Sequence, residues 1–258
     1  MNCLESLGIP AGVTSVVGSG GKTTLLGVLA EDVARRGGHV VLATTTHFMP
    51  FDGIPLVTGA DEGEVAAALS EGGIACVGTP MRATSNKRGL TGAAGRGDAV
   101  GPGDAPVQAA SKLCPSPIPV ERLAALASHV LLEADGSRRL PLKAHADHEP
   151  VVPACSARTV LVVGASGLGR PVREATHRPE LFCERAGCAP DDDATPQLVA
   201  QALVAEVGAG VVSPGVVVVN QADARPQEAL ELTACLHALG LRARVLVGSI
   251  RSRELREA

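Results

Sequence analysis

The sequence predicts an α/β fold in three layers, a mostly parallel sheet with helices on both faces. Short β-branched apolar runs alternate with helical patterns along the 258 residues, and the first run meets a glycine-rich turn that opens a helix. Apolar residues make up 45% of the chain, with no Trp or Tyr and only three Phe. A core of Ala, Val and Leu suits tightly packed parallel strands. We expect one domain over residues 1–258, with a mobile loop at 91–107, where glycine and proline are frequent.

The glycine-rich turn follows a predicted strand at residues 13–17. Glycines allow backbone N–H groups to face an anion, and the N-terminus of the helix that follows adds about half a positive charge. Lys22 is expected to reach terminal phosphates, and the Thr23 hydroxyl to ligate Mg²⁺. The pattern G-x-x-x-x-G-K-[ST] is shortened here, because Val16 stands where its first glycine belongs. The predicted nucleotide contacts are Gly18, Ser19, Gly20, Gly21, Lys22, Thr23 and Thr24.

This order of strand, loop, lysine and helix predicts a P-loop NTPase-like domain that binds Mg²⁺ with ATP or GTP. The alternative is a glycine-rich β-to-α turn without a ligand. A second strand at 40–43 leads into Thr44-Thr45-Thr46-His47, at the end of the sheet where open α/β folds bind ligands. Thr46 and His47 are therefore candidate phosphate contacts, unless the threonines only extend the strand. A strand at 56–58, a helix at 61–70 and a strand at 74–77 are expected to follow.

A helix at 120–128 precedes a hydrophobic strand that ends in Glu133-Ala134-Asp135. Side chains alternate along a strand, so both acids face one side, and a cation between them would relieve their repulsion. We predict Glu133 as the second protein ligand of Mg²⁺, and Asp135 as the residue that orients the attacking water or supports the metal from behind. The alternative is a strand that ends in exposed acids.

Basic residues follow this strand. Arg138, Arg139 and Lys143 are expected to contact phosphate or an anionic substrate, whereas Arg82, Lys87 and Arg88 are interpreted as solvated surface. The cluster His145, Asp147, His148 and Glu149 has the residue types of a zinc site without its helical spacing, and hydrogen-bonded anchoring of the loop is the favoured interpretation. His177, Cys183 and Cys188 are a weaker metal candidate.

The last third of the chain repeats the α/β pattern, with strands at 159–163, 215–219 and 243–247 and helices at 177–185, 195–206 and 226–239. The strand at 215–219 runs into Asn220-Gln221-Ala222-Asp223, which resembles the N-K-x-D base-reading segment of GTPases. Asn220 and Asp223 are predicted to contact the nucleotide base. The alternative for Asp223 is the N-cap of the next helix.

Composition excludes several classes of partner. The formal net charge is −4, and the scarcity of aromatic residues removes the platforms on which nucleic-acid bases stack. The seven cysteines occur singly, as in a reduced cytoplasmic protein. The N-terminal residues show no signal sequence, and no apolar run reaches the roughly 18 residues of a membrane helix. We expect a cytoplasmic protein without nucleic-acid or membrane partners, and the sequence leaves its oligomeric state open.

Five segments in order resemble one bacterial family: the glycine loop, T-T-T-H, L-L-E-A-D-G-S-R-R-L-P-L-K, H-R-P-E and V-V-V-V-N-Q-A-D. They are similar to the accessory proteins of selenium-dependent molybdenum hydroxylases, also described as selenium cofactor biosynthesis proteins. The resemblance implies a P-loop-type protein that assists maturation of a partner enzyme of that class. The chain departs from it at His145, where a proline is expected, at Gln221, where a lysine is expected, and by the insertion at 91–107.

A fainter likeness is to the central ATPase domain of the Mur ligases, which implies Glu133 as a Mg²⁺ ligand and Asn220 as an adenine contact. Three functions follow as alternatives. The first is a nucleotide-hydrolysing accessory protein, with Lys22, Glu133 and Asp135 as catalytic residues. The second is an ATP-dependent kinase or ligase that activates a small substrate. The third is a nucleotide-gated binding module that does not hydrolyse its ligand.

Overall fold

The computed structural model describes residues 2–81 and 112–258. Its centre is a nine-stranded sheet in the order β13-β12-β11-β9-β1-β7-β2-β4-β3, parallel throughout except for the antiparallel pair of β12 and β13. The strands are β1 (Gly12–Gly18), β2 (Val40–Thr44), β3 (Leu56–Val57), β4 (Ile74–Val77), β7 (His129–Glu133), β9 (Ser156–Gly164), β11 (Val216–Asn220), β12 (Arg244–Ser249) and β13 (Glu254–Glu257). The predicted mostly parallel α/β sheet is confirmed.

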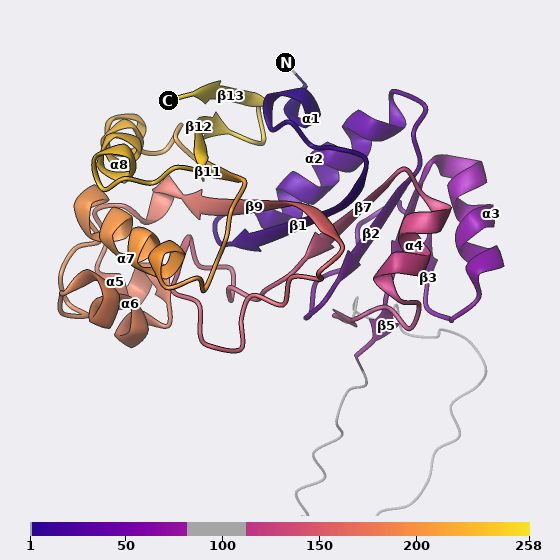
Figure 1. The fold of residues 1–258 in the computed structure, drawn as a ribbon, viewed down its shortest axis with the longest axis horizontal. Coiled ribbons are helices and arrows are strands. Elements are labelled where there is room, and N and C mark those ends of the chain that lie inside the picture. The colour runs from indigo at the N-terminus through magenta and orange to yellow at the C-terminus, as the bar shows by residue number, and fades with distance from the viewer. Residues whose placement is uncertain (1, 82–111) are drawn as a thin grey trace, which may run out of the picture.

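Helices cover both faces of the sheet (Figure 1). On one face, α1 and α2 pack against alternate strand residues such as Val16, Leu131 and Val218, whereas the other face is covered by the helices from α3 to α8. The helices are α1 (Cys3–Ser6), α2 (Lys22–Ala34), α3 (Glu62–Gly72), α4 (Val120–Leu126), α5 (Val172–Ala175), α6 (Pro179–Ala186), α7 (Pro196–Gly208) and α8 (Pro226–Ala238), with a short 3₁₀ turn, η1 (Ala165–Gly167). The inner strands β1, β2, β7 and β11 are almost entirely buried on both faces, as in parallel sheets generally.

Two small ribbons lie outside the main sheet. In one, β8 (Leu142–Lys143) pairs in parallel with β10 (Thr176–His177), and in the other β5 (Thr79–Pro80) pairs with β6 (Leu113–Cys114). The ribbon of β8 and β10 brings the segment after Asp135 beside the H-R-P-E segment, which is more than thirty positions further along the chain. Residues distant in sequence thereby meet at the carboxyl end of the central strands.

Most predicted elements are found within one to three residues of their expected bounds. Of the three threonines after the second predicted strand, only Thr44 extends it, because β2 ends at Thr44 and Thr45 and Thr46 form a bend. The strand predicted at 243–247 is not the last strand of the sheet, since β13 follows it and forms an antiparallel edge. The predicted loop at 91–107 and the basic residues Arg82, Lys87 and Arg88 lie outside the described residues. Within the described ranges, no helix has the length and apolarity to cross a membrane.

Candidate functional site: a glycine loop beside two strand-end acids

The glycines of the loop are required by its packing. Gly18 and Gly20 have φ angles of 90° and 82°, a region that favours glycine. A Cβ on Gly20 would lie 2.3 Å from the Cα of Gly164, and one on Gly18 would lie 2.3 Å from the carbonyl oxygen of Val162. The loop therefore lies directly against the end of β9, and larger residues cannot replace these two glycines without moving the backbone.

The Thr23 hydroxyl and the Glu133 carboxylate meet beside the loop, as predicted. Thr23 Oγ1 donates a hydrogen bond to Glu133 Oε2 at 2.9 Å. The contact forms because β7 pairs directly with β1, so both strand ends lie next to the N-terminus of α2. Burial raises the pKa of Glu133, and the Lys22 ammonium and the Thr23 hydroxyl only partly offset this. A divalent cation would favour the ionised carboxylate, and oxygen donors of this kind suit Mg²⁺.

Lys22 folds back over its own loop. Its ammonium donates to the Gly18 carbonyl oxygen at 2.7 Å and to Ser137 Oγ at 3.2 Å. The same nitrogen lies 3.0 Å from Asp135 Oδ1 and 3.8 Å from Glu133 Oε1. The lysine is thus buried between the two predicted acids, in reach of the loop that it was expected to complete.

Asp135 is the centre of a buried ionic cluster. One carboxylate oxygen, Oδ2, accepts hydrogen bonds of 2.8 Å from the Gly18 N–H, Lys143 Nζ and His145 Nε2. The residue is completely buried. Burial alone raises the pKa of this carboxyl, but Lys22, His145 and Lys143 outweigh it and hold the pKa below its usual range. Asp135 therefore stays ionised and fixes the loop and its lysine from behind.

Two series of ionic contacts connect this cluster with other side chains. Lys143 Nζ also lies 2.7 Å from Glu149 Oε2, which accepts a 2.7 Å hydrogen bond from Arg178. On the other side, His145 Nδ1 lies 2.6 Å from Glu206 Oε2 on α7, and Arg185 pairs with the same carboxylate. These contacts of His145 and Glu149 fit the favoured interpretation, in which the cluster anchors the loop by hydrogen bonds.

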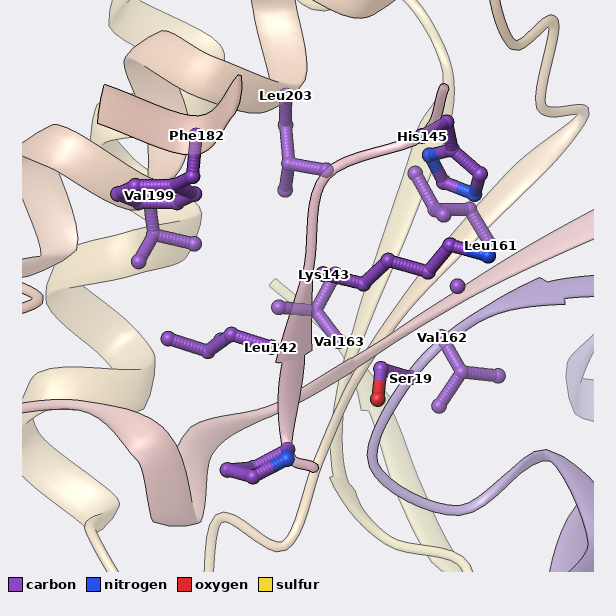
Figure 2. Close-up of a pocket in the computed structure, with 12 residues that line it drawn as sticks. Ser19, Leu142, Lys143, His145, Leu161, Val162, Val163, Phe182, Val199 and Leu203 are labelled. Carbon is purple, nitrogen blue, oxygen red and sulfur yellow. The ribbon is translucent and has the colours of Figure 1, made fainter. Parts of the chain in front are cut away.

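A small pocket lies beneath the loop (Figure 2). Phe182 and Val199 from α6 and α7 line one side, and the Lys143 ammonium and His145 lie on the other. Its free volume is about 10 Å³, which is room for about one water molecule. This pocket is therefore too small for a phosphate group.

A large cavity of about 890 Å³ lies beside the loop. Volumes of this order hold small-molecule ligands. Residues 20–24 of the loop, residues 45–49 after β2 and residues 136–141 line it, together with Glu133, Glu149, Ser166, Arg170, His177 and Gln221. It brings together the predicted contacts Lys22, Thr23, Thr24, Thr46, His47, Glu133, Arg138 and Arg139. Ser19, Asp135 and Lys143 lie behind the loop instead, and do not line the cavity.

The two predicted base contacts, Asn220 and Asp223, lie apart from the cavity lining. The Asn220 amide donates to the Gly20 carbonyl oxygen at 2.7 Å and accepts from the Ile250 N–H at 2.8 Å, so it supports the loop. Asp223 is exposed and does not line the cavity. It does not cap α8 either, because Arg225 is the N-cap and no side chain bonds to that helix end. Gln221, which replaces the expected lysine, accepts from Ser166 Oγ at 2.6 Å beside the loop.

The metal candidate at His177, Cys183 and Cys188 is also not formed. Among the residues that the structure describes, no three His, Cys, Asp or Glu side chains gather as a metal site. His177 lines the large cavity, whereas Cys183 and Cys188 contact each other, with 3.4 Å between their sulfur atoms. Magnesium at Thr23 and Glu133 would therefore depend on phosphate oxygens and water for its remaining ligands.

Sequence reasoning missed several residues of the site. Glu206 and Arg185 complete the contacts of His145, and Ser166 and Arg170 line the cavity. Ser166 and Arg170 follow β9, and the rule that ligands bind at the carboxyl ends of parallel strands would have pointed to that segment. No local pattern marks Glu206, which lies 61 positions from His145.

The family model described as YqeC protein matches residues 14–180 of the chain. The chain belongs to the YqeC family. A relative from Escherichia coli (strain K12), described as "Uncharacterized protein YqeC", is 36% identical over 182 residues, which are 69% of this chain and 62% of the relative. The chain therefore matches less than two thirds of the length of that YqeC protein. No solved structure matches the chain. The YqeC match includes the loop, both strand-end acids and the H-R-P-E segment, but ends before β11.

The His145 contacts give a pH-dependent prediction. Burial lowers the pKa of His145, but hydrogen bonds to Asp135 and Glu206 outweigh it and raise the pKa above its usual value. Because the folded pKa is raised, the charged imidazole stabilises fully below the unfolded value of about 6.5, and its contribution is lost as the pH rises through the folded value. We expect the melting temperature of wild type to fall toward that of His145→Gln as the pH rises above about 6.5.

Melting curves of both proteins at several pH values measure this. The exposed His237 on α8 offers a control, and His237→Gln should show no such convergence. A difference between wild type and His145→Gln that stays constant over the whole range would show that folding does not raise the pKa of this imidazole.

Proposed function

We propose that this protein binds a nucleoside triphosphate with Mg²⁺, hydrolyses it slowly, and acts as an accessory protein in maturation of a selenium-dependent molybdenum hydroxylase or its cofactor. The observation that carries the nucleotide site is the 2.9 Å hydrogen bond between Thr23 and Glu133, beside the glycine loop and at the wall of the 890 Å³ cavity. A hydroxyl, a carboxylate and a lysine in this arrangement are the parts that phosphoryl transfer uses.

The loop would bind the phosphate tail through its backbone N–H groups and the N-terminus of α2. Lys22 would exchange its contact with the Gly18 carbonyl oxygen for a phosphate oxygen. Mg²⁺ between Thr23 and Glu133 would neutralise charge that develops on the β- and γ-phosphates. The backbone and side chains that hold the loop, Lys22 and Glu133 are already packed. Positioning of the phosphates and neutralisation of their charge would therefore account for the chemistry.

Asp135 fits the supporting role better than the role of orienting water. It is fully buried, lies outside the cavity lining and accepts from three donors through one oxygen. When Lys22 moves toward a phosphate, Lys143 and His145 still balance the Asp135 charge. We propose that Asp135 holds the loop in its binding conformation, and that Lys22, Thr23 and Glu133 contact the nucleotide or its metal.

The accessory role rests on the family. Membership of the YqeC family fits the resemblance to accessory proteins of selenium-dependent molybdenum hydroxylases, and supports a partner enzyme of that class. ATP and GTP remain equal candidates, because Asn220 bonds to the Gly20 and Ile250 backbone, and Asp223 is exposed outside the cavity lining. The proposal therefore concerns the triphosphate and its metal, and leaves the base to experiment.

Calorimetric and thermal-shift titrations with ATP and GTP, each with and without Mg²⁺, test the proposal. A ligand at about 100 times its dissociation constant should stabilise the wild type by about 2.7 kcal/mol. Glu133→Gln removes the carboxylate that would hold the metal, so we expect it to lose the additional affinity that Mg²⁺ confers, about tenfold, while triphosphate alone still binds.

Glu184→Gln on the exposed face of α6 is a matched control, and should retain the full response to Mg²⁺. The metal assignment fails if Glu133→Gln responds to Mg²⁺ as wild type does. The nucleotide assignment fails if neither triphosphate stabilises the wild-type protein with Mg²⁺ present.

A further inference from the structure

Three arginines line the large cavity without an acidic partner among the residues that the structure describes. Arg138 and Arg139 follow the strand-end acids, and Arg170 follows η1 after β9. Most other arginines of the described residues pair with carboxylates, as Arg122 does with Glu62. Arg138, Arg139 and Arg170 form no ion pair with any described residue. Exposed arginines are often solvated surface, so their convergence on one cavity is the feature that needs a reason.

The carboxylates of the cavity do not neutralise these arginines. Glu133 is bonded to Thr23, and Glu149 lies 2.7 Å from both Lys143 and Arg178. Burial raises the pKa of Glu149, but Arg178 and Lys143 outweigh it and lower that pKa to about 2, so this carboxylate is fully committed to its own cations. The charge of Arg138, Arg139 and Arg170 is therefore left for a ligand.

The backbone at this side of the cavity is held in an uncommon conformation. Among described residues other than glycine, positive φ angles occur at Arg138, Arg139, Arg178, Gln221 and Arg253, with values of 49°, 61°, 66°, 60° and 60°. Three of these residues line the cavity and Arg178 follows His177 in the chain. This conformation is strained for residues other than glycine, and such strain gathers at ligand sites. The surrounding structure therefore holds the backbone at Arg138 and Arg139 in this conformation.

His177 adds a neutral hydrogen-bonding group to the lining of the same cavity. It lies on β10, in register with Lys143 on β8, and lines the cavity. Burial and the nearby cations Arg178, Lys143 and Arg138 lower the pKa of His177 to about 4. The imidazole is uncharged at neutral pH and can donate one hydrogen bond, and the cations that act on it mark a region of positive potential.

We propose that Arg138, Arg170 and His177 form a second oxyanion site, which binds the phosphate or carboxylate group of a small co-substrate in the same cavity as the nucleotide loop. The co-substrate role rests on the proposed nucleotide function, whereas the oxyanion site stands on its own contacts. A guanidinium matches the planar geometry of either oxyanion, and two of them with an imidazole N–H give a multidentate site. The volume of about 890 Å³ leaves space beside a triphosphate tail for a second small molecule.

Calorimetric titration with inorganic phosphate tests the site. We expect two phosphates to bind the wild-type protein, one at the loop and one at the arginines, and one phosphate to remain in the Lys22→Ala variant. Arg170→Gln and Arg138→Gln should each weaken the second phosphate about tenfold or more. Arg242→Gln is the matched control, because Arg242 is exposed and lies outside the cavity.

The same titration with acetate separates the two oxyanion classes, and the tighter of the two identifies the group of the co-substrate. The second site is refuted if wild type binds a single phosphate whose affinity is unchanged in Arg170→Gln and Arg138→Gln. If no triphosphate binds wild type but phosphate binding still depends on Arg170, the nucleotide function fails and the oxyanion site is retained. If triphosphate binds wild type and the arginine variants bind phosphate as wild type does, the oxyanion site fails and the nucleotide function is retained.

Discussion

Replacing Lys22 with alanine is expected to weaken binding of a triphosphate about 100-fold. The lysine contributes a buried ammonium group beside the loop, and hydrogen bonds to charged groups contribute about 1.5–3 kcal/mol each. At the upper end of that range, the loss is about two orders of magnitude in affinity. Calorimetry of the variant against ATP and GTP with Mg²⁺ measures it.

The Lys22→Ala variant should still fold. Asp135 keeps its hydrogen bonds from the Gly18 N–H, Lys143 and His145 when Lys22 is absent. Circular dichroism and a melting curve check this. Lys22→Met is the control for volume, because it retains most of the side chain without the charge, and it should lose as much affinity as the alanine variant. Unchanged affinity in either folded variant would remove the loop as a phosphate site.

The order of elements in the fold was predictable because parallel strands and their helices are coded locally. The runs at Val40–Thr44 and Val216–Asn220 are apolar and β-branched, and each is buried on both faces of the sheet. The short end elements were not predictable. Helix α1 has only four residues, and the Asn2 side chain at its N-cap accepts a hydrogen bond from the helix. Strand β13 depends on pairing with β12 rather than on its own composition. Such elements are stabilised by contacts that the local sequence does not show.

The contact of Thr23 with Glu133 was predictable for a similar reason. Both residues end or follow strands of one parallel sheet, and the strands happen to be neighbours. The contact of Asn220 with the loop was not predictable, because an amide at a strand end fits two roles and its position relative to Gly20 is decided only by tertiary packing. The partner of His145 could not be predicted from the sequence, since Glu206 comes from a helix on another part of the sheet.

Asp135 offers the largest expected change in stability. The Asp135→Asn variant leaves Lys22, Lys143 and His145 around a neutral amide in a fully buried position. Removing one partner of a buried ionic cluster usually costs about 3–5 kcal/mol. In a protein of this size each kcal/mol shifts the melting temperature by about 2–4 °C, so we expect a fall of about 10 °C at pH 7. Differential scanning calorimetry measures the change.

The dependence of this loss on pH identifies its cause. The folded pKa of Asp135 is lowered, so its stabilising contribution is complete above the unfolded value of about 3.9 and is lost as the pH falls below that value. The gap between wild type and Asp135→Asn should therefore narrow below about pH 4. Asp61→Asn at the N-cap of α3 is the control, because that side chain bonds to the Gly63 N–H at an exposed position, and the variant should lose no more than about 1 kcal/mol. A variant Asp135→Asn that melts within 2 °C of wild type at pH 7 would mean, by the same relation, that Asp135 does not organise the charges behind the loop.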